Sequence, residues 1–281
     1  MSPSKRQPDL TGRPTEVVVR IRLRYTKRGR LRFTSHRDVA RAFERAIRRA
    51  GIPMAYSSGF TAHPRISWAG AAPTGAASEA EYVELGLAEH RDPDQLARDL
   101  DAALPPGIDV IEAVTSASGG KLAERIDASK WEIALHGIDT EQLRAATDAL
   151  LAAESAEVDR LTKEGMRRID VRAALVSALI AEPPAEASGQ PEAVSPAGDT
   201  AVCAILGVVV RQTTPVVRPD DIVTALTAVA GLPAPVSSLT TRVAQGRLME
   251  DGSILDPLAA DDADGSVVRP PVASQERLRT P

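Results

Sequence analysis

Four histidines and a nearby run of carboxylates are the residues of this chain best suited to acid–base chemistry. His36 and His63 lie in the N-terminal third, and an imidazole that titrates near neutrality suits a general acid or base. A site that joins them needs a carboxylate partner, and Glu79, Glu81 and Glu84 follow closely in the sequence. The structural alternative is that His36 belongs to the first turn of a helix and His63 to a loop.

Motifs for metals and nucleotides are absent from the sequence. No two histidines have the i, i+4 spacing of a helical metal site, and no HExxH, CxxC, Walker or dinucleotide-binding glycine pattern occurs. The single cysteine, Cys203, lies in the apolar run AVCAILGVVV, which favours a small buried side chain. One cysteine excludes an internal disulfide framework. We therefore expect no cofactor and no metal.

Positive charge is concentrated near the N-terminus. Between residues 20 and 49, 12 Lys or Arg residues oppose two acidic ones, a net charge of +10, although the whole chain carries −4. Arg20, Arg22 and Arg24 alternate with apolar residues, so they share one side of a strand. Such a cationic surface is suited to phosphate, above all that of RNA. The alternatives are an acidic protein partner, or a solvated face with salt bridges to the acidic helix at 92–101.

The elements that position these residues follow the order β-α-β-β-α-β. The period-two alternation over 17–25 predicts a strand with one buried and one cationic face. Ser35, with Asp38 three residues later, predicts a helix start. The remaining elements are strands at 52–56, 81–89 and 108–116 and a helix at 91–104. This order is typical of the ferredoxin-like α+β fold, whose helices cover one face of the sheet and leave the other open.

The second half repeats this pattern, which predicts two ferredoxin-like units in tandem. The expected domains are a first unit with the basic face at 17–117 and a second unit at 130–250. Pro, Ala, Gly and Glu dominate an insertion at 182–199, which predicts disorder there. We expect disorder also in the N-terminus at 1–16 and in a tail at 251–281.

Bulk composition is that of a globular protein with a modest aromatic content. Of 281 residues, 43% are hydrophobic and 3% aromatic, so Ala, Val, Leu and Ile must build the core. The sequence shows neither a signal peptide nor an apolar run long enough to span a membrane. We therefore expect a cytoplasmic protein.

Five segments together resemble one bacterial family. They are RYTKRGRLRFTSHRD at 24–38, RAIRRAGIPMAYSSGF at 45–60, HPRISWA at 63–69, SEAEY at 78–82 and TKEGMRRIDVR at 162–172. They look like the radical-SAM-linked (radical-SAM-associated) family, a domain of unknown function found beside or fused to a B12-binding-type radical SAM protein. The resemblance spans about residues 20–250 without the insertion.

This resemblance implies an accessory role, because the chain lacks the CxxxCxxC cluster motif of radical SAM enzymes. We expect an accessory or RNA-recruiting partner of a radical SAM protein on a separate chain, with RNA (tRNA or rRNA) as a further partner and no membrane contact. The alternatives are an independent RNA-acting enzyme using His36 or His63, with Glu81 as a third candidate catalytic residue, and a purely structural protein-interaction module. The residues expected to bind RNA or the partner are Arg20, Arg22, Arg24, Lys27, Arg30, Arg32, Ser35, His63, Arg65, Tyr82 and Arg172.

Overall fold

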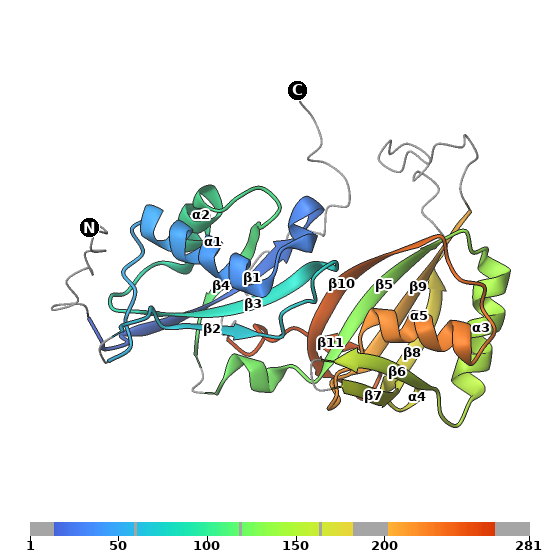
Figure 1. Cartoon of the computed structure of the whole chain (residues 1–281). Helices are drawn as coiled ribbons and strands as arrows, with labels where there is room; N and C mark the ends of the chain where they lie inside the picture. Colours follow the sequence, from blue (N-terminus) through green and yellow to red (C-terminus); the bar gives the residue numbers. More distant parts are fainter. Residues whose placement is uncertain (1–13, 59–60, 118–119, 163–164, 182–201, 262–281) are drawn as a thin grey trace.

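Two βα halves share one large sheet. The computed structural model describes residues 14–58, 61–117, 120–162, 165–181 and 202–261. The predicted disorder at 182–199 and over most of 1–16 lies outside the described residues. Within them, the fold is mixed α+β, with five α-helices and a large, mostly antiparallel sheet (Figure 1).

The first half contains four strands and two α-helices. Its strand order is β4-β1-β3-β2, and neighbouring strands are antiparallel. Short 3-10 helices, η1 (Gly29–Phe33) and η2 (Leu122–Arg125), precede α1 and follow β4. The bounds are β1 Val19–Lys27, α1 His36–Arg49, β2 Ile66–Ala69, β3 Ala77–Leu87, α2 Pro93–Ala103 and β4 Val110–Thr115.

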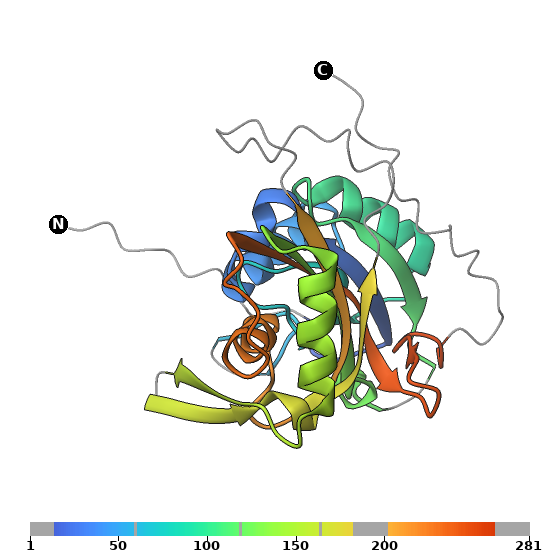
Figure 2. The ribbon, with the colours of Figure 1, turned by 90° about the vertical axis from the view of Figure 1, so that its right-hand side faces the viewer.

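The second half repeats the order of strands and helices of the first half, with one hairpin inserted. Its sheet order is β10-β5-β9-β8, and the hairpin β6-β7 extends away from the main body (Figure 2). The bounds are β5 Ala128–His136, α3 Thr140–Ala152, β6 Glu157–Thr162, β7 Gly165–Asp170, α4 Val171–Ala174, β8 Leu175–Ala181, β9 Cys203–Arg211, α5 Pro219–Ala228, β10 Ser237–Leu248 and β11 Ile254–Leu255.

A short parallel contact joins the halves into one sheet. Thr241 and Arg242 of β10 pair with Ala77 and Ser78 at the start of β3. The same edge of β3 pairs further along with β2. The junction between the halves therefore lies where β10 meets the loop that connects β2 to β3.

Each half has its own apolar core beneath its helices. In the first half, Ile21 and Leu23 of β1 pack with Phe43 of α1 and Leu100 of α2. In the second half, the cluster includes apolar residues of β5, β9, α3 and α5. The period-two pattern of β1 is confirmed, since its apolar side chains face the helices and its arginines face the opposite side.

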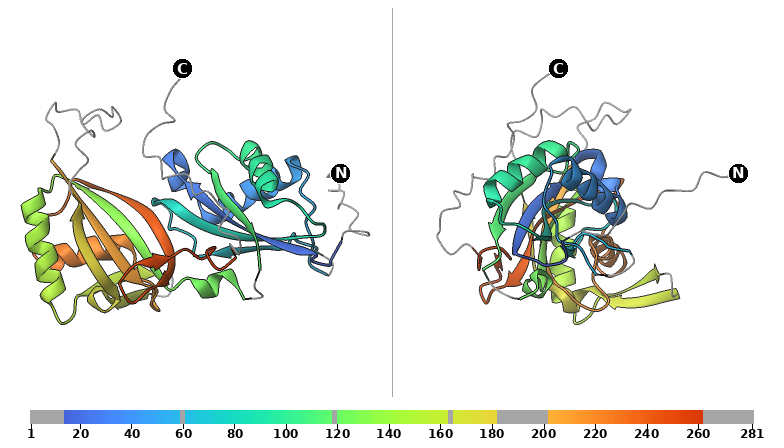
Figure 3. Two further views of the ribbon diagram at one scale, coloured as in Figure 1. Left: turned by 180° about the vertical axis from the view of Figure 1, so that it is seen from behind. Right: turned by 90° about the vertical axis from the view of Figure 1, so that its left-hand side faces the viewer.

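The opposite face of the first half is not open, as had been expected. A small cluster that includes Tyr82, Leu122 and Leu258 is buried there. Figure 3 shows η2 and the chain around β11 on the side of the sheet opposite α1 and α2. The predicted disorder from residue 251 is therefore wrong for 251–261, because these residues cover the sheet and pair with it.

The third element of the first half, predicted as a strand at 52–56, lies later in the chain. Residues 52–56 make only isolated bridges, whereas the strand itself is β2 at Ile66–Ala69. Residues 61–80, between the predicted strands at 52–56 and 81–89, thus contain β2 and the start of β3. The predicted helix start at Ser35 is confirmed, since its side chain accepts a backbone N–H of α1, and Asp92 and Asp139 cap α2 and α3 in the same way.

Ser35 should stabilise α1 measurably. Its hydroxyl accepts the Asp38 backbone N–H at 3.3 Å and donates to the Asp38 carboxylate at 2.7 Å. We expect Ser35→Ala to lower the free energy of unfolding by about 1 kcal/mol, because the first turn loses its cap. Urea unfolding checks this, with Thr34→Ala as the control. An equal effect of the two substitutions would contradict a capping role for Ser35.

In the part of the chain that the structure describes, no helix is both long and apolar enough to cross a membrane.

Candidate nucleic-acid interface

The arginines of β1 lie together on the face of the sheet opposite α1 and α2. There they pair with carboxylates of the protein itself. Arg22 is 1% exposed. Its guanidinium donates to Glu84 at 2.8 Å and to Asp261 at 2.7 Å. Arg20, whose side chain is 47% exposed, reaches the same Glu84 at 3.2 Å. Arg22 is therefore part of the interior and offers no free charge to a ligand.

Arg24 is covered in the same way from the C-terminal side. Its guanidinium lies 3.3 Å from Asp256 and 3.8 Å from Glu112. The hydroxyl of Tyr82 donates to Asp256 at 3.1 Å. We call Glu84, Glu112, Asp256 and Asp261 the acidic cover. These carboxylates neutralise the positive charge of the β1 arginines, which the sequence had suggested as an RNA-binding surface.

The ionisation of these groups follows from burial and pairing. Burial lowers the pKa of Arg22, but hydrogen bonds to Asp261 and Glu84 outweigh it and raise the pKa above its usual value. Burial and the charge of Asp256 raise the pKa of Tyr82 far above its usual range. Arg22 is therefore charged and Tyr82 neutral at physiological pH.

Lys27 and Arg32 hold the junction together. The Lys27 ammonium is buried and donates to the backbone carbonyls of Ala72 and Pro73 at 3.3 and 3.1 Å. Burial lowers its pKa. Arg32 donates to the carbonyl of Thr240 at 3.2 Å, across the two halves. These contacts give both residues a structural role.

Arg65 and Arg172 likewise contact backbone carbonyls. Arg65 is exposed and donates to Tyr56 at 3.3 Å. Arg172 donates to Leu151 at 3.1 Å and thereby links α4 to α3. Arg172 lies in the second half, and none of its hydrogen bonds reaches the cationic elements of the first.

The predicted catalytic residues are not joined by any hydrogen bond within the described residues. His36 packs edge-on against Trp68, with ring centroids 5.2 Å apart. His63 is exposed, and its backbone N–H donates to the Ser57 hydroxyl. Glu81 is buried and pairs with Arg242. This arrangement places the three candidates in three different environments.

A row of exposed cations lies on α1. Arg37, Arg41, Arg45 and Arg48 recur at helical spacing on its exposed side, and we call them the α1 arginine stripe. Arg41 has a solvent-exposed contact with Asp38 at 3.4 Å. Among the described residues, the other three have no carboxylate within 4 Å. In the sequence these arginines counted only toward the positive charge between residues 20 and 49.

Two exposed residues just before α1 extend this surface. Arg30, one of the predicted binding residues, is exposed in η1. Phe33, at the end of η1, is 66% exposed, and the guanidinium of Arg32 lies 5.7 Å from its ring centroid. Ser35, also predicted to bind, caps α1 instead. A basic helix next to an exposed aromatic ring has the two features that single-stranded RNA requires.

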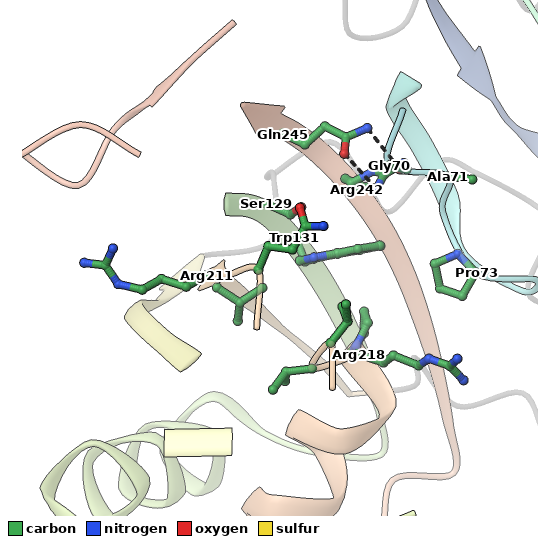
Figure 4. Close-up of a pocket in the computed structure, with 14 residues that line it drawn as sticks. Gly70, Ala71, Pro73, Ser129, Trp131, Arg211, Arg218, Arg242 and Gln245 are labelled. Carbon is green, nitrogen blue, oxygen red and sulfur yellow. Dashed lines mark hydrogen bonds between the residues drawn. The ribbon is translucent and has the colours of Figure 1, made fainter. Parts of the chain in front are cut away.

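A cavity of about 290 Å³ lies at the junction of the halves. Its walls come from the β2–β3 loop, β5, the end of β9, the chain before α5, and β10 (Figure 4). The charged residues of its lining are Arg211, Arg218 and Arg242. None of these was among the predicted site residues.

With this geometry established, the chain can be placed in a family. A profile described as "Uncharacterized protein conserved in bacteria (DUF2344)" matches residues 20–219. The chain belongs to the DUF2344 family. No curated protein matches it.

The DUF2344 match runs from β1 to the start of α5. It therefore includes the α1 arginine stripe and most segments that form the junction cavity. Arg242, Asp256 and Asp261 lie beyond it. Asp256 and Asp261, which neutralise arginines of β1, thus come from outside the DUF2344 match. The same holds for Arg242, which lines the cavity.

Proposed function

We propose that this protein is an RNA-recruiting accessory subunit of a separate radical SAM enzyme, with tRNA or rRNA as the recruited molecule. The observation that carries RNA recruitment is the α1 arginine stripe, a row of exposed cations on one side of a helix. The radical SAM partner is supported by the resemblance of five segments to the radical-SAM-linked family. Cytoplasmic localisation belongs to the same proposal.

The scaffold that we propose for this function is a pair of tandem ferredoxin-like units. The orders β4-β1-β3-β2 and β10-β5-β9-β8 correspond position by position. In each half the first helix follows the first strand and the second helix precedes the last strand. The hairpin β6-β7 and the short helix α4 are then an insertion in the second unit.

The dimensions of the α1 arginine stripe suit a polyanion. From Arg37 to Arg48 the helix rises about 16 Å, so the stripe can contact several successive phosphates. Guanidinium groups bind phosphate oxygens through paired donors. Phe33 offers a ring for a base that is not paired. We expect single-stranded or looped RNA to bind better than a continuous duplex.

The salt dependence of RNA binding tests this surface. We expect the triple variant Arg41→Gln, Arg45→Gln and Arg48→Gln to bind a tRNA or rRNA fragment more weakly. The slope of log affinity against log salt should fall in magnitude by about 2 to 3, since each lost phosphate contact removes about one unit. Filter binding at several salt concentrations measures both quantities.

A matched control removes the same charge elsewhere. Arg91→Gln, Arg98→Gln and Arg144→Gln neutralise three exposed arginines, of which Arg91 precedes α2, Arg98 lies on α2 and Arg144 lies on α3. If both triple variants change the slope equally, a general charge effect explains binding and the stripe has no special role. If the wild type binds no RNA but binds an acidic protein through the stripe, the structural interaction module is the better explanation.

The accessory role requires a separate measurement. Purification of the tagged chain from its native host should recover a radical SAM protein. The triple variant of the stripe should still recover that protein while losing the RNA. Recovery of RNA without any radical SAM protein would overturn the accessory half of the proposal alone.

A further inference from the structure

The junction cavity has a rigid wall built around Arg242. This side chain is 3% exposed, and it donates to the Ser78 hydroxyl and the Gln245 side-chain carbonyl, each at 3.2 Å. It also pairs with Glu81. Its guanidinium lies 5.4 Å from the ring centroid of Trp131. A wall whose donors are already fixed is pre-organised and need not rearrange when a ligand enters.

Gln245, which lies beside Arg242, holds the β2–β3 loop in place through Gly70. Its amide donates to the Gly70 carbonyl at 3.2 Å, and a methyl group on Gly70 would overlap the Gln245 side chain. Gly70 also has a φ of +58°, a conformation that favours glycine. The β2–β3 loop therefore lies closely against β10 where it lines the cavity.

The other two arginines of the lining are Arg211 and Arg218. Both are exposed, and neither guanidinium pairs with a carboxylate among the described residues. Figure 4 shows them on opposite sides of Trp131, with their side chains extending away from each other. The Ser129 hydroxyl also lines the cavity. No Asp or Glu side chain contributes to the lining, so its unmatched charge is positive.

Size and the apolar part of the lining restrict the ligand further. About 290 Å³ lies at the small end of ligand pockets. Val216, Val217 and Pro73 provide apolar surface beside the arginines. One arginine can satisfy both oxygens of a carboxylate, whereas two arginines from different sides match the additional oxygens of a phosphate group.

We propose that the junction cavity binds a small phosphate ester of about the size of a nucleoside monophosphate. Arg218 and Arg211, whose exposed side chains turn toward the cavity when the ligand enters, bind the phosphate, and the organic part lies against the valine and proline surface. This site is separate from the α1 arginine stripe, and it does not depend on RNA recruitment.

Trp131 provides a direct test, because Trp68 and Trp131 are the chain's two tryptophans. In a Trp68→Phe background, AMP is expected to change the fluorescence of Trp131 in a saturable way. Ribose 5-phosphate and inorganic phosphate, titrated in parallel, should bind more weakly than AMP, and adenosine should not bind. The two smaller anions distinguish recognition of the phosphate alone from recognition of the whole ester.

Variants identify the residues responsible. Arg218→Gln or Arg211→Gln in the same background should weaken AMP binding at least tenfold, whereas Arg144→Gln on α3 should leave it unchanged. The triple variant of the α1 arginine stripe should also bind AMP normally. Equal binding of adenosine and AMP, equal effects of Arg218→Gln and Arg144→Gln, or no response to AMP at millimolar concentration would each overturn the proposal.

Discussion

Glu81→Gln is expected to lower the free energy of unfolding by about 3 to 5 kcal/mol, since it leaves Arg242 as a buried and uncompensated charge. Both side chains of this pair are 4% exposed. Glu81 also accepts the Ala72 backbone N–H at 3.1 Å, which fixes the β2–β3 loop. Burial lowers the pKa of Lys27, and the Glu81 carboxylate partly offsets this effect. One substitution thus affects the main charged groups of the junction.

Glu79→Gln is a matched control for this prediction. Glu79 lies two residues away on β3 and pairs with the exposed Arg28. An exposed pair of this kind contributes about 0 to 1 kcal/mol. Urea unfolding of both variants measures the difference. If Glu81→Gln costs no more than Glu79→Gln, the buried pair does not stabilise the junction.

A second large effect is expected at the acidic cover. Asp261→Asn should lower the free energy of unfolding by roughly 3 kcal/mol at neutral pH, because the Asp261 carboxylate pairs with two arginines. It lies 2.7 Å from the guanidinium of Arg22 and 2.6 Å from that of Arg125. Asp148→Asn, at an exposed position of α3, should change stability by less than about 0.5 kcal/mol.

This effect should depend on pH in a defined direction. Burial raises the pKa of Asp261, but hydrogen bonds from Arg125 and Arg22 outweigh it and hold the pKa below the usual value. Its stabilisation is therefore present above the unfolded-state pKa of about 3.9 and is lost as the pH falls through the lower folded-state pKa. The difference in unfolding free energy between wild type and Asp261→Asn should shrink over that acidic range. A difference that stayed constant would contradict the ion pairs.

Asp261→Asn also tests whether the arginines of β1 contribute to RNA binding. In the wild type, the acidic cover neutralises Arg22 and Arg24, so the strand contributes little positive charge to the surface. If RNA binding depends on the α1 arginine stripe alone, Asp261→Asn should leave RNA affinity and its salt dependence unchanged wherever the variant remains folded.

Local structure was predictable where its cause is local. The helix starts at Ser35, Asp92 and Asp139 follow from side chains that accept nearby backbone N–H groups. The two faces of β1 follow from its alternating residues, since neighbouring side chains of a strand point to opposite sides. Residues 66–69 show no such local pattern, and the strand β2 was consequently predicted too early, at 52–56.

The sequence by itself therefore determined the α+β class, the apolar face of β1 and the concentration of positive charge near the N-terminus. Tertiary structure decided which of those charges remain available. The partners of Arg22 and Arg24 include Asp261 and Asp256, more than two hundred residues away, and their pairing depends on how the C-terminal chain crosses the sheet. The junction cavity has the same origin, because no single stretch of chain contains enough of its lining to show it. An excess of charge is a property of composition, but its compensation is a property of contacts between distant residues.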